Sequence, residues 1–123
     1  MYSNSDIIAK SWLVVEVTNQ ILAKKDLVVD KIFLIGSYAN GTATSRSDID
    51  FLIQLKGFKR PGMYYPSWEE IEEIHKTLDT RRIHVIFGTE LAQQSLAEKH
   101  NKKYREIPQG VLNANTHKSV LPQ

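Results

Sequence analysis

The spacing of apolar residues in the first part of the chain predicts a helix over about residues 5–24. Apolar side chains recur there every three to four positions, and we expect the buried face to carry Ile8, Trp12, Val15 and Leu22. The polar cluster Ser3–Asp6 supplies side-chain oxygens that can accept hydrogen bonds from the first free backbone N–H groups of a helix. A capped helix is therefore the first predicted element.

Three apolar segments predict strands. Ile32–Ile35 is a continuous apolar run that ends at Gly36, a pattern typical of a strand buried on both faces. Residues 48–55 and 83–87 place apolar side chains at every second position, as a strand does when one face packs on the core. A short helical turn near residues 38–40 is expected to follow the first strand.

Two later helices carry capping signals. Ser67 and Glu70 have the spacing of a capping box, which predicts a helix that starts near Trp68. We expect the inward stripe of this helix to hold Trp68, Ile71, His75 and Leu78. Thr89 is expected to cap a last helix that runs to about Lys99.

The order helix, strand, short helix, strand, helix, strand, helix predicts an α/β (α+β) fold around a small sheet. The 123 residues fit one domain, and about 41% of them are hydrophobic, enough for one modest core. We place this single domain at residues 1–107. Residues 108–123 are polar and contain glycine and proline, so we interpret them as a loose tail.

Composition narrows the class of protein. The chain has no cysteine, which excludes disulfides and thiolate metal sites. No apolar run reaches 18 residues, and the first residues lack the pattern of a secretory signal, so we expect a cytoplasmic protein without a membrane partner. The net charge of +2 does not indicate a nucleic-acid binder.

The turn after the first predicted strand can bind an anion. A glycine at the end of a strand lets the backbone approach a ligand closely, and Gly36 stands at that position. The backbone N–H groups of the turn and the Ser37 hydroxyl are hydrogen-bond donors suited to phosphate. Taken alone, Gly36-Ser37 is more often an ordinary strand-ending turn.

Two acids open the second predicted strand. Asp48 and Asp50 are two positions apart, so on a strand their side chains share one face and repel each other. A divalent cation removes that repulsion, and Mg²⁺ prefers such hard oxygen ligands together with substrate phosphates. A solvated sheet face is the alternative interpretation of the acids alone. Because the turn and the acids lie on successive strands, the combination indicates a triphosphate held beside a metal site.

The combined motif resembles that of the DNA polymerase β-like nucleotidyltransferase superfamily, in particular its minimal nucleotidyltransferase members. That family carries an apolar residue followed by Gly-Ser, then a spacer, then Asp-x-Asp between apolar residues. The longer motif of the minimal members matches this chain at Gly36, Ser37, Ala39, Gly41, Ala43, Ser47, Asp48, Ile49 and Asp50. The resemblance implies a polymerase β palm-like fold, a small mixed sheet with helices packed on it.

The resemblance also implies an activity, which is transfer of a nucleoside monophosphate from an NTP to an acceptor hydroxyl with loss of pyrophosphate. Asp48 and Asp50 would hold two Mg²⁺ ions, with Mn²⁺ as a substitute, and two ions can clamp the attacking and leaving oxygens. Gly36, Ser37 and Ser47 would bind the phosphates. Minimal members act beside a helical, HEPN-like protein in toxin–antitoxin systems, so the resemblance implies such a partner or a homodimer.

One position departs from the family pattern. Catalytic members carry a third carboxylate on a later strand, and His84 stands at that place in this chain. His84 could act as a general base, could bind a softer ion such as Mn²⁺ or Zn²⁺, or could mark a degenerate site. Two functions therefore stay open: a nucleotidyltransferase, and a weak or inactive antitoxin-like module that binds nucleotide or a protein partner.

Other side chains have simpler interpretations. The loop 56–66 and the start of the next helix bring basic and aromatic residues together: Lys56, Phe58, Lys59, Arg60, Tyr64, Tyr65 and Trp68. These residues could bind a nucleic-acid base or an acceptor strand by stacking and phosphate contacts. We favour the alternative that the aromatic side chains pack on the core. The basic residues between 99 and 105 predict a solvated helix end. His75 and His100 lack a second ligand at metal spacing. Glu90 lies at a helix start and is not expected to replace the third acid.

Overall fold

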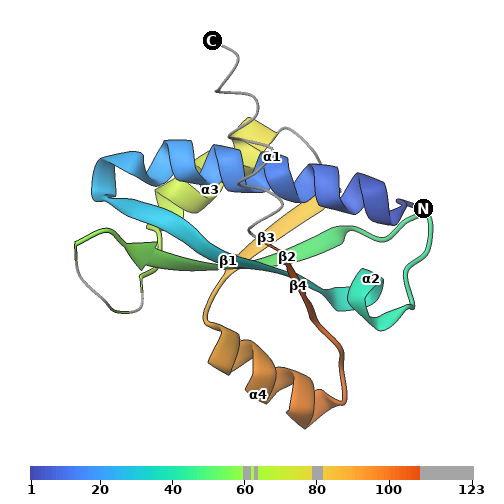
Figure 1. Cartoon of the computed structure of the whole chain (residues 1–123). Helices are drawn as coiled ribbons and strands as arrows, with labels where there is room; N and C mark the ends of the chain where they lie inside the picture. Colours follow the sequence, from blue (N-terminus) through green and yellow to red (C-terminus); the bar gives the residue numbers. More distant parts are fainter. Residues whose placement is uncertain (60–61, 63, 79–81, 109–123) are drawn as a thin grey trace.

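The protein is described by a computed structural model over residues 1–59, 62, 64–78 and 82–108. Its centre is a four-stranded sheet in the order β3-β2-β1-β4 (Figure 1). The strands are β1 (Leu27–Ile35), β2 (Ile49–Gly57), β3 (Ile83–Phe87) and β4 (Arg105–Ile107). β1 is antiparallel to β2 and to β4, whereas β2 and β3 are parallel. The sheet is therefore mixed, and the predicted α/β (α+β) class is confirmed.

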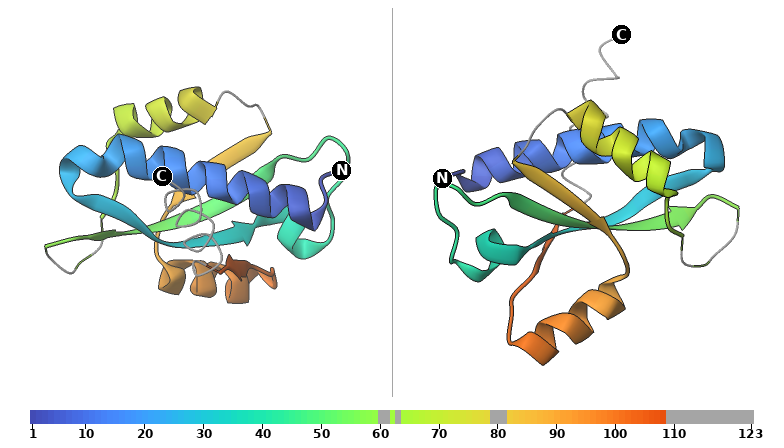
Figure 2. Two further views of the ribbon diagram at one scale, coloured as in Figure 1. Left: turned by 45° about the horizontal axis from the view of Figure 1, so that its top comes forward. Right: turned by 180° about the vertical axis from the view of Figure 1, so that it is seen from behind.

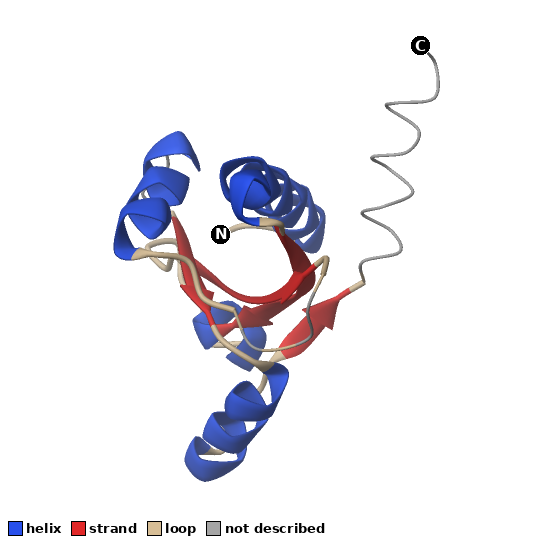
Figure 3. Ribbon diagram, turned by 90° about the vertical axis from the view of Figure 1, so that its left-hand side faces the viewer, coloured by secondary structure: helices blue, strands red, loops and turns tan. Residues whose placement is uncertain are grey.

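Helices lie on both faces of the sheet. α1 (Asn4–Leu22), continued by the short 3₁₀ turn η1 (Ala23–Lys25), and α3 (Trp68–Leu78) cover one face, as Figure 3 shows in an end-on view. α2 (Gly36–Asn40) and α4 (Glu90–His100) lie on the other face, and α4 stands well away from α1 in both views of Figure 2. Among the described residues, none of the helices has both the length and the hydrophobicity that a membrane span requires.

The main core lies between the sheet and the pair α1 and α3. The odd-numbered positions of β2 point into it, and the side chains of Ile49, Phe51, Ile53 and Leu55 are all buried. Because side chains alternate along a strand, Asp50, Leu52 and Gln54 point to the opposite face, where α4 lies. This alternation decides which residues of β2 face solvent or a ligand and which ones hold the fold together.

Side-chain caps fix the helix starts where the sequence predicts them. Ser3 forms a reciprocal capping box with Asp6, and its Oγ accepts from the Asp6 backbone N–H at 3.1 Å. Ser67 and Glu70 make the same pair of bonds at the start of α3, at 3.2 and 2.7 Å. Thr89 Oγ1 accepts from the Ala92 N–H at 3.1 Å. These bonds satisfy donors that a helix start otherwise leaves free.

The predicted buried face of α1 is wrong by about one position. Leu22 is buried as expected, but Ile8, Trp12 and Val15 are only partly buried, and the buried face consists of Ile7, Ser11, Val14, Val17, Thr18 and Leu22. This face carries two buried hydroxyls: Ser11 Oγ donates a hydrogen bond to the Ile8 carbonyl oxygen at 2.6 Å, whereas Thr18 Oγ1 has no partner among the described residues. A hydroxyl satisfied by its own helix can be buried at low cost, which a count of apolar residues misses.

The predicted stripe of α3 and the packing of its aromatic neighbours also need correction. Trp68 is 72% exposed, and Ile74 takes the central buried position of α3 beside Leu78. Phe58 and Tyr65 are exposed too, so the expectation that these aromatics pack on the core is wrong; only Tyr64 packs partly against it. Arg60 lies outside the described residues.

The strands differ from the sequence prediction at three places. β2 spans Ile49–Gly57 rather than residues 48–55, so Asp48 lies just before it. β1 starts at Leu27 rather than Ile32, because Val28 and Val29 pair with the far end of β2. β4 was not predicted, because its three residues contain a single apolar side chain, Ile107, which pairs with Ile32 across the sheet. Most of the predicted tail, residues 109–123, lies outside the described residues.

Candidate functional site

Three strands bring the motif residues together at one end of the sheet. β1 ends where β2 and β3 begin, and the pairing register places Ile35 opposite Asp50, and Asp50 opposite His84. Gly36 follows Ile35 directly. The turn, the acid and the histidine therefore form one row across three adjacent strands, on the face that the core does not use.

Gly36 touches Asp50 so closely that no other residue fits there without a shift. Gly36 has a φ of +72°, and a Cβ at this position would lie 2.3 Å from Asp50 Oδ2. Both the left-handed backbone and the missing side chain therefore require glycine. The following turn is short and ends at Gly41, with the Thr42 N–H bonded to the Ser37 carbonyl oxygen at 3.0 Å. The structure thus brings the phosphate turn and one metal-ligand candidate into contact.

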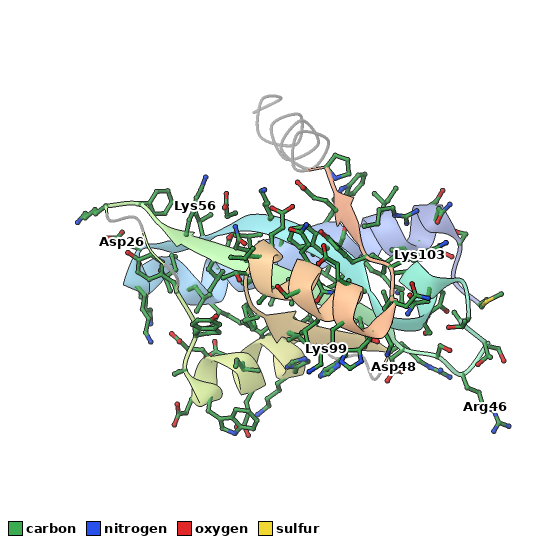
Figure 4. The ribbon with its side chains drawn as sticks, turned by 90° about the horizontal axis from the view of Figure 1, so that it is seen from below. Asp26, Arg46, Asp48, Lys56, Lys99 and Lys103 are labelled. Carbon is green, nitrogen blue, oxygen red and sulfur yellow. The ribbon has the colours of Figure 1, made fainter. Side chains whose placement is uncertain are left out.

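The loop before β2 carries the second acid. Asp48 immediately precedes β2 and is exposed, and Figure 4 shows it on the α4 side of the molecule, with Arg46 projecting outward from the loop. Ser47 Oγ accepts from the Thr44 N–H at 2.8 Å, while the Ser47 N–H donates to the Thr44 carbonyl oxygen at 3.1 Å. In this structure the Ser47 hydroxyl therefore holds the loop that presents Asp48.

His84 faces the other oxygen of Asp50. Its Nδ1 lies 3.4 Å from Asp50 Oδ1, and the side chains are 56% and 28% exposed respectively. Burial raises the pKa of Asp50 above its ordinary value; His84 opposes that shift through its charge and hydrogen bond, and the negative charge of Asp48 adds to it. Asp50 thus lies between the phosphate turn, on its Oδ2 side, and the imidazole, on its Oδ1 side.

The two acids fit a divalent cation. Asp50 is partly buried beside a like charge, and a cation would remove both costs of its ionised form. Carboxylate oxygens are hard ligands, and Mg²⁺ often uses only one or two of them together with phosphate oxygens. Over the residues that the structure describes, no group of three His, Cys, Asp or Glu side chains is placed to hold a metal. An ion held by these two acids could take its remaining ligands from a substrate.

His75 has a structural role that the sequence did not reveal. Its Nδ1 lies 3.0 Å from the Ile71 carbonyl oxygen and its Nε2 accepts from the Val85 N–H at 3.1 Å, which joins α3 to β3. Its ring centroid is 5.9 Å from that of His84. The contact depends on how α3 docks on the sheet, so no local pattern could have indicated it.

Two further charged residues have partners of their own. Glu90 forms an ion pair with Lys31 at 2.7 Å, and that it does not replace the third acid stays a prediction. Arg82 Nη1 lies 3.4 Å from the Ser45 carbonyl oxygen and links the start of β3 to the loop that carries Asp48. The exposed basic residues at the end of α4 include Lys99 and Lys103, both labelled in Figure 4.

A family model and a solved structure resemble this chain. The family model described as "Nucleotidyltransferase domain" matches residues 15–109. No curated protein matches the chain. A solved structure described as "Crystal structure of the toxin-antitoxin with AMP-PNP" aligns with 85% of this chain and 82% of that chain, at 18% sequence identity and a TM-score of 0.39.

Proposed function

Because this chain belongs to the nucleotidyltransferase domain family, we propose that it transfers a nucleoside monophosphate from an NTP to an acceptor hydroxyl, with pyrophosphate as the leaving group. The observation that supports this most is the contact between Gly36 and Asp50. A Cβ at Gly36 would lie 2.3 Å from the carboxylate, so phosphates bound at the turn would lie beside the acid.

Each motif residue has a role in this proposal. Gly36, Ser37 and Ser47 bind the phosphates through backbone N–H groups and hydroxyls. Asp48 and Asp50 hold Mg²⁺, as two ions, with Mn²⁺ as a substitute. Bound divalent cations supply neutralisation of the charge that develops on the transferring phosphoryl group.

His84 is suited to accept the proton of the acceptor hydroxyl. Asp50 Oδ1 lies 3.4 Å from Nδ1, and a proton on Nδ1 would be directed at the carboxylate. That arrangement leaves Nε2 as the basic nitrogen, as in other sites where a carboxylate orients an imidazole. The distance is long for a hydrogen bond, and such contacts commonly shorten when substrate binds.

A second function is favoured by the same residue. An imidazole replaces the third acid, so the site could bind nucleotide without efficient transfer and act through a protein partner, either a helical HEPN-like protein or a second copy of the chain. Replacing His84→Asp restores the family acid. A gain in transfer of tenfold or more in this variant would indicate that the wild-type site is weakened; no gain would argue that His84 is itself the working base.

Calorimetry followed by a transfer assay distinguishes the two functions, and it also reveals the case in which neither function applies. Each NTP is titrated into the protein with Mg²⁺ or Mn²⁺, and the protein is then incubated with labelled NTP and acceptor candidates. Binding with label transfer supports the transferase, and binding without transfer to any acceptor supports the module. An absence of binding with both metals and all four NTPs contradicts both.

A further inference from the structure

A groove runs along the edge of β3 that faces away from β2 and reaches the candidate site at His84. β3 is the last strand of the sheet on this side, and α3 with the preceding segment Tyr65–Trp68 forms the opposite wall. The groove has a volume of about 690 Å³, within the range of about 300–1,000 Å³ that small-molecule sites occupy. His84 belongs to its lining and lies 3.4 Å from Asp50, so the groove adjoins the candidate site through this histidine.

The lining of the groove is apolar and aromatic. Trp68 and Tyr65 are 72% and 55% exposed, and Ile86 and Phe87 of β3 contribute further apolar surface. Large apolar side chains gathered in one exposed cleft are typical of a ligand surface. The lining carries one carboxylate, Glu72, and one ammonium group, Lys76, so their formal charges cancel. A polyanion such as RNA would require an excess of cations instead.

The shape of the groove is held by hydrogen bonds of His75. Its imidazole accepts from the Val85 N–H on one wall and contacts the Ile71 carbonyl oxygen on the other, at 3.1 and 3.0 Å. The N–H of an edge strand is thereby satisfied, which removes a donor that an added strand would need. The groove is therefore preformed and better suited to a compact ligand than to strand addition.

The row of site residues sets the direction from which an acceptor must approach. Gly36 follows β1, Asp50 lies on β2 and His84 on β3, so the phosphate turn and the histidine lie on opposite sides of the acid. In an in-line displacement the attacking oxygen enters opposite the leaving group. If pyrophosphate is held at Gly36 and Ser37, the acceptor enters from the β3 side, where the groove lies.

We propose that this groove is the acceptor site and that it takes an uncharged small molecule with an aromatic or apolar body and one reactive hydroxyl. The proposal rests on the proposed transferase function. The hydroxyl oxygen forms a bond to the α-phosphorus of the NTP, and the bond from that phosphorus to the α–β bridging oxygen breaks. Pyrophosphate leaves with the electron pair of that bond, and the hydroxyl proton passes to the His84 imidazole.

The two tryptophans of the chain allow a binding test that does not require turnover. Trp68 lines the groove, whereas Trp12 lies on α1 and packs partly against the core. The probe is 2-phenylethanol, an uncharged aromatic alcohol, and the readout is the shift of the two indole N–H signals in a ¹⁵N–¹H NMR spectrum. We expect the Trp68 signal to shift in a saturable manner and the Trp12 signal to stay. No saturable shift of Trp68 would overturn the proposal.

Variants show whether the groove itself binds the probe. Tyr65→Ala is expected to weaken binding of 2-phenylethanol about tenfold, read from the Trp68 signal, and should not disturb the core because Tyr65 is exposed. The matched control is Leu91→Ala, which removes a 74% exposed apolar side chain from α4. Equal affinities in the two variants would contradict the proposal.

Competition separates a failure of this proposal from a failure of the proposed function. AMP-PNP with Mg²⁺ is expected to bind together with 2-phenylethanol and to leave its affinity within about threefold. Displacement of the probe would assign the groove to the nucleobase, which overturns the acceptor proposal but keeps the transferase. A Trp68 shift with a uridine hexanucleotide and none with 2-phenylethanol would assign the groove to RNA. A failure of AMP-PNP to bind would instead count against the transferase, whatever the probe does.

Discussion

The two ends of the sheet differ in whether their carboxylates are paired with a basic side chain. At the end where β1 starts, each acid has a lysine: Asp26 with Lys59 at 3.3 Å, and Asp30 with Lys56 at 3.6 Å. At the end where β1 finishes, neither Asp48 nor Asp50 pairs with a lysine or arginine that the structure describes. Figure 4 shows the two ends, labelled by Asp26 and Lys56 on one side and by Arg46 and Asp48 on the other.

Glu70 and Asp50 show what this difference does to a carboxyl group. Burial acts to raise the pKa of Glu70, but hydrogen bonds from Ser67 and the ion pair with Lys25 outweigh it and leave that pKa lowered. Burial also raises the pKa of Asp50, and the imidazole of His84 does not cancel the shift. The first acid stabilises the fold as it stands, whereas the second leaves an ionised group that a bound cation would stabilise.

Asp50→Asn removes the uncompensated charge and should alter activity more than any other substitution considered below. We expect nucleotide transfer to fall by about 10²–10³-fold or more, because a group that acts on developing charge is lost. Stability of the ligand-free protein at neutral pH should rise by about 0.5–2 kcal/mol, as when an active-site cost is removed. Transfer assays and thermal denaturation measure the two quantities.

Asp26→Asn at the other end is the matched control for that prediction. It removes an exposed ion pair with Lys59 and should change stability by less than about 1 kcal/mol, with nucleotide binding unchanged. Wild-type nucleotide transfer in Asp50→Asn, or loss of nucleotide binding in Asp26→Asn, would contradict the distinction between the two ends.

Gly36→Ala tests the contact between the phosphate turn and Asp50. The new Cβ would lie 2.3 Å from Asp50 Oδ2, so the carboxylate must move and nucleotide affinity should fall at least tenfold. The left-handed backbone adds a cost of about 1–2 kcal/mol in stability. Calorimetry with AMP-PNP and Mg²⁺ reads the first effect and denaturant unfolding the second.

Gly41→Ala separates the clash from the backbone cost. Gly41 has a φ of +76°, but a Cβ there would meet no atom within 4 Å. Its stability loss should resemble the backbone cost at Gly36, while nucleotide affinity stays within about threefold of wild type. Similar losses of affinity in both variants would show that the turn, rather than the contact, limits binding.

A pH titration distinguishes the two acids by the sign of their effect on stability. The pKa of Asp50 in the folded state lies above its ordinary value of 3.8, so the folded state binds this proton more tightly than the unfolded state does. The free energy of unfolding therefore falls as pH rises from 3.8 through the folded-state pKa. Glu70 has a lowered folded pKa, so its contribution is present above 4.5 and disappears as pH falls through the folded value. The stability gain of Asp50→Asn should therefore vanish at acid pH, and a gain that persists there would contradict this assignment.

The smallest expected effect is that of Lys25→Ala. Lys25 lies 3.0 Å from Glu70, and its side chain is half exposed, so the pair should contribute about 0.2–1 kcal/mol. The free energy of unfolding from denaturant titration measures this loss, and nucleotide binding should not change. A loss above about 2 kcal/mol would show that the ion pair is more than a surface contact.

Local features of the fold could be predicted from residue types and their spacing. Ser67 and Thr89 mark the starts of α3 and α4. Such a cap can be predicted from sequence because it depends only on the capping side chain and the backbone N–H groups of the first turn. The alternation of β2 separates Asp50 from the core positions Ile49 and Phe51, because the strand repeat is two residues. The same logic failed for the face of α1, where a buried serine satisfies its hydroxyl within the helix.

Contacts between residues on different strands and helices became known from the folded protein alone. The row of Gly36, Asp50 and His84 follows from the register of β1, β2 and β3, which are joined by long connections and whose pairing no local pattern fixes. The bond from the Val85 N–H to His75 and the exposure of Trp68 depend likewise on how α3 docks against β3. Residue types indicated the chemistry of this site, but contacts between distant segments set its geometry, because side chains from separate strands meet only after the sheet has formed.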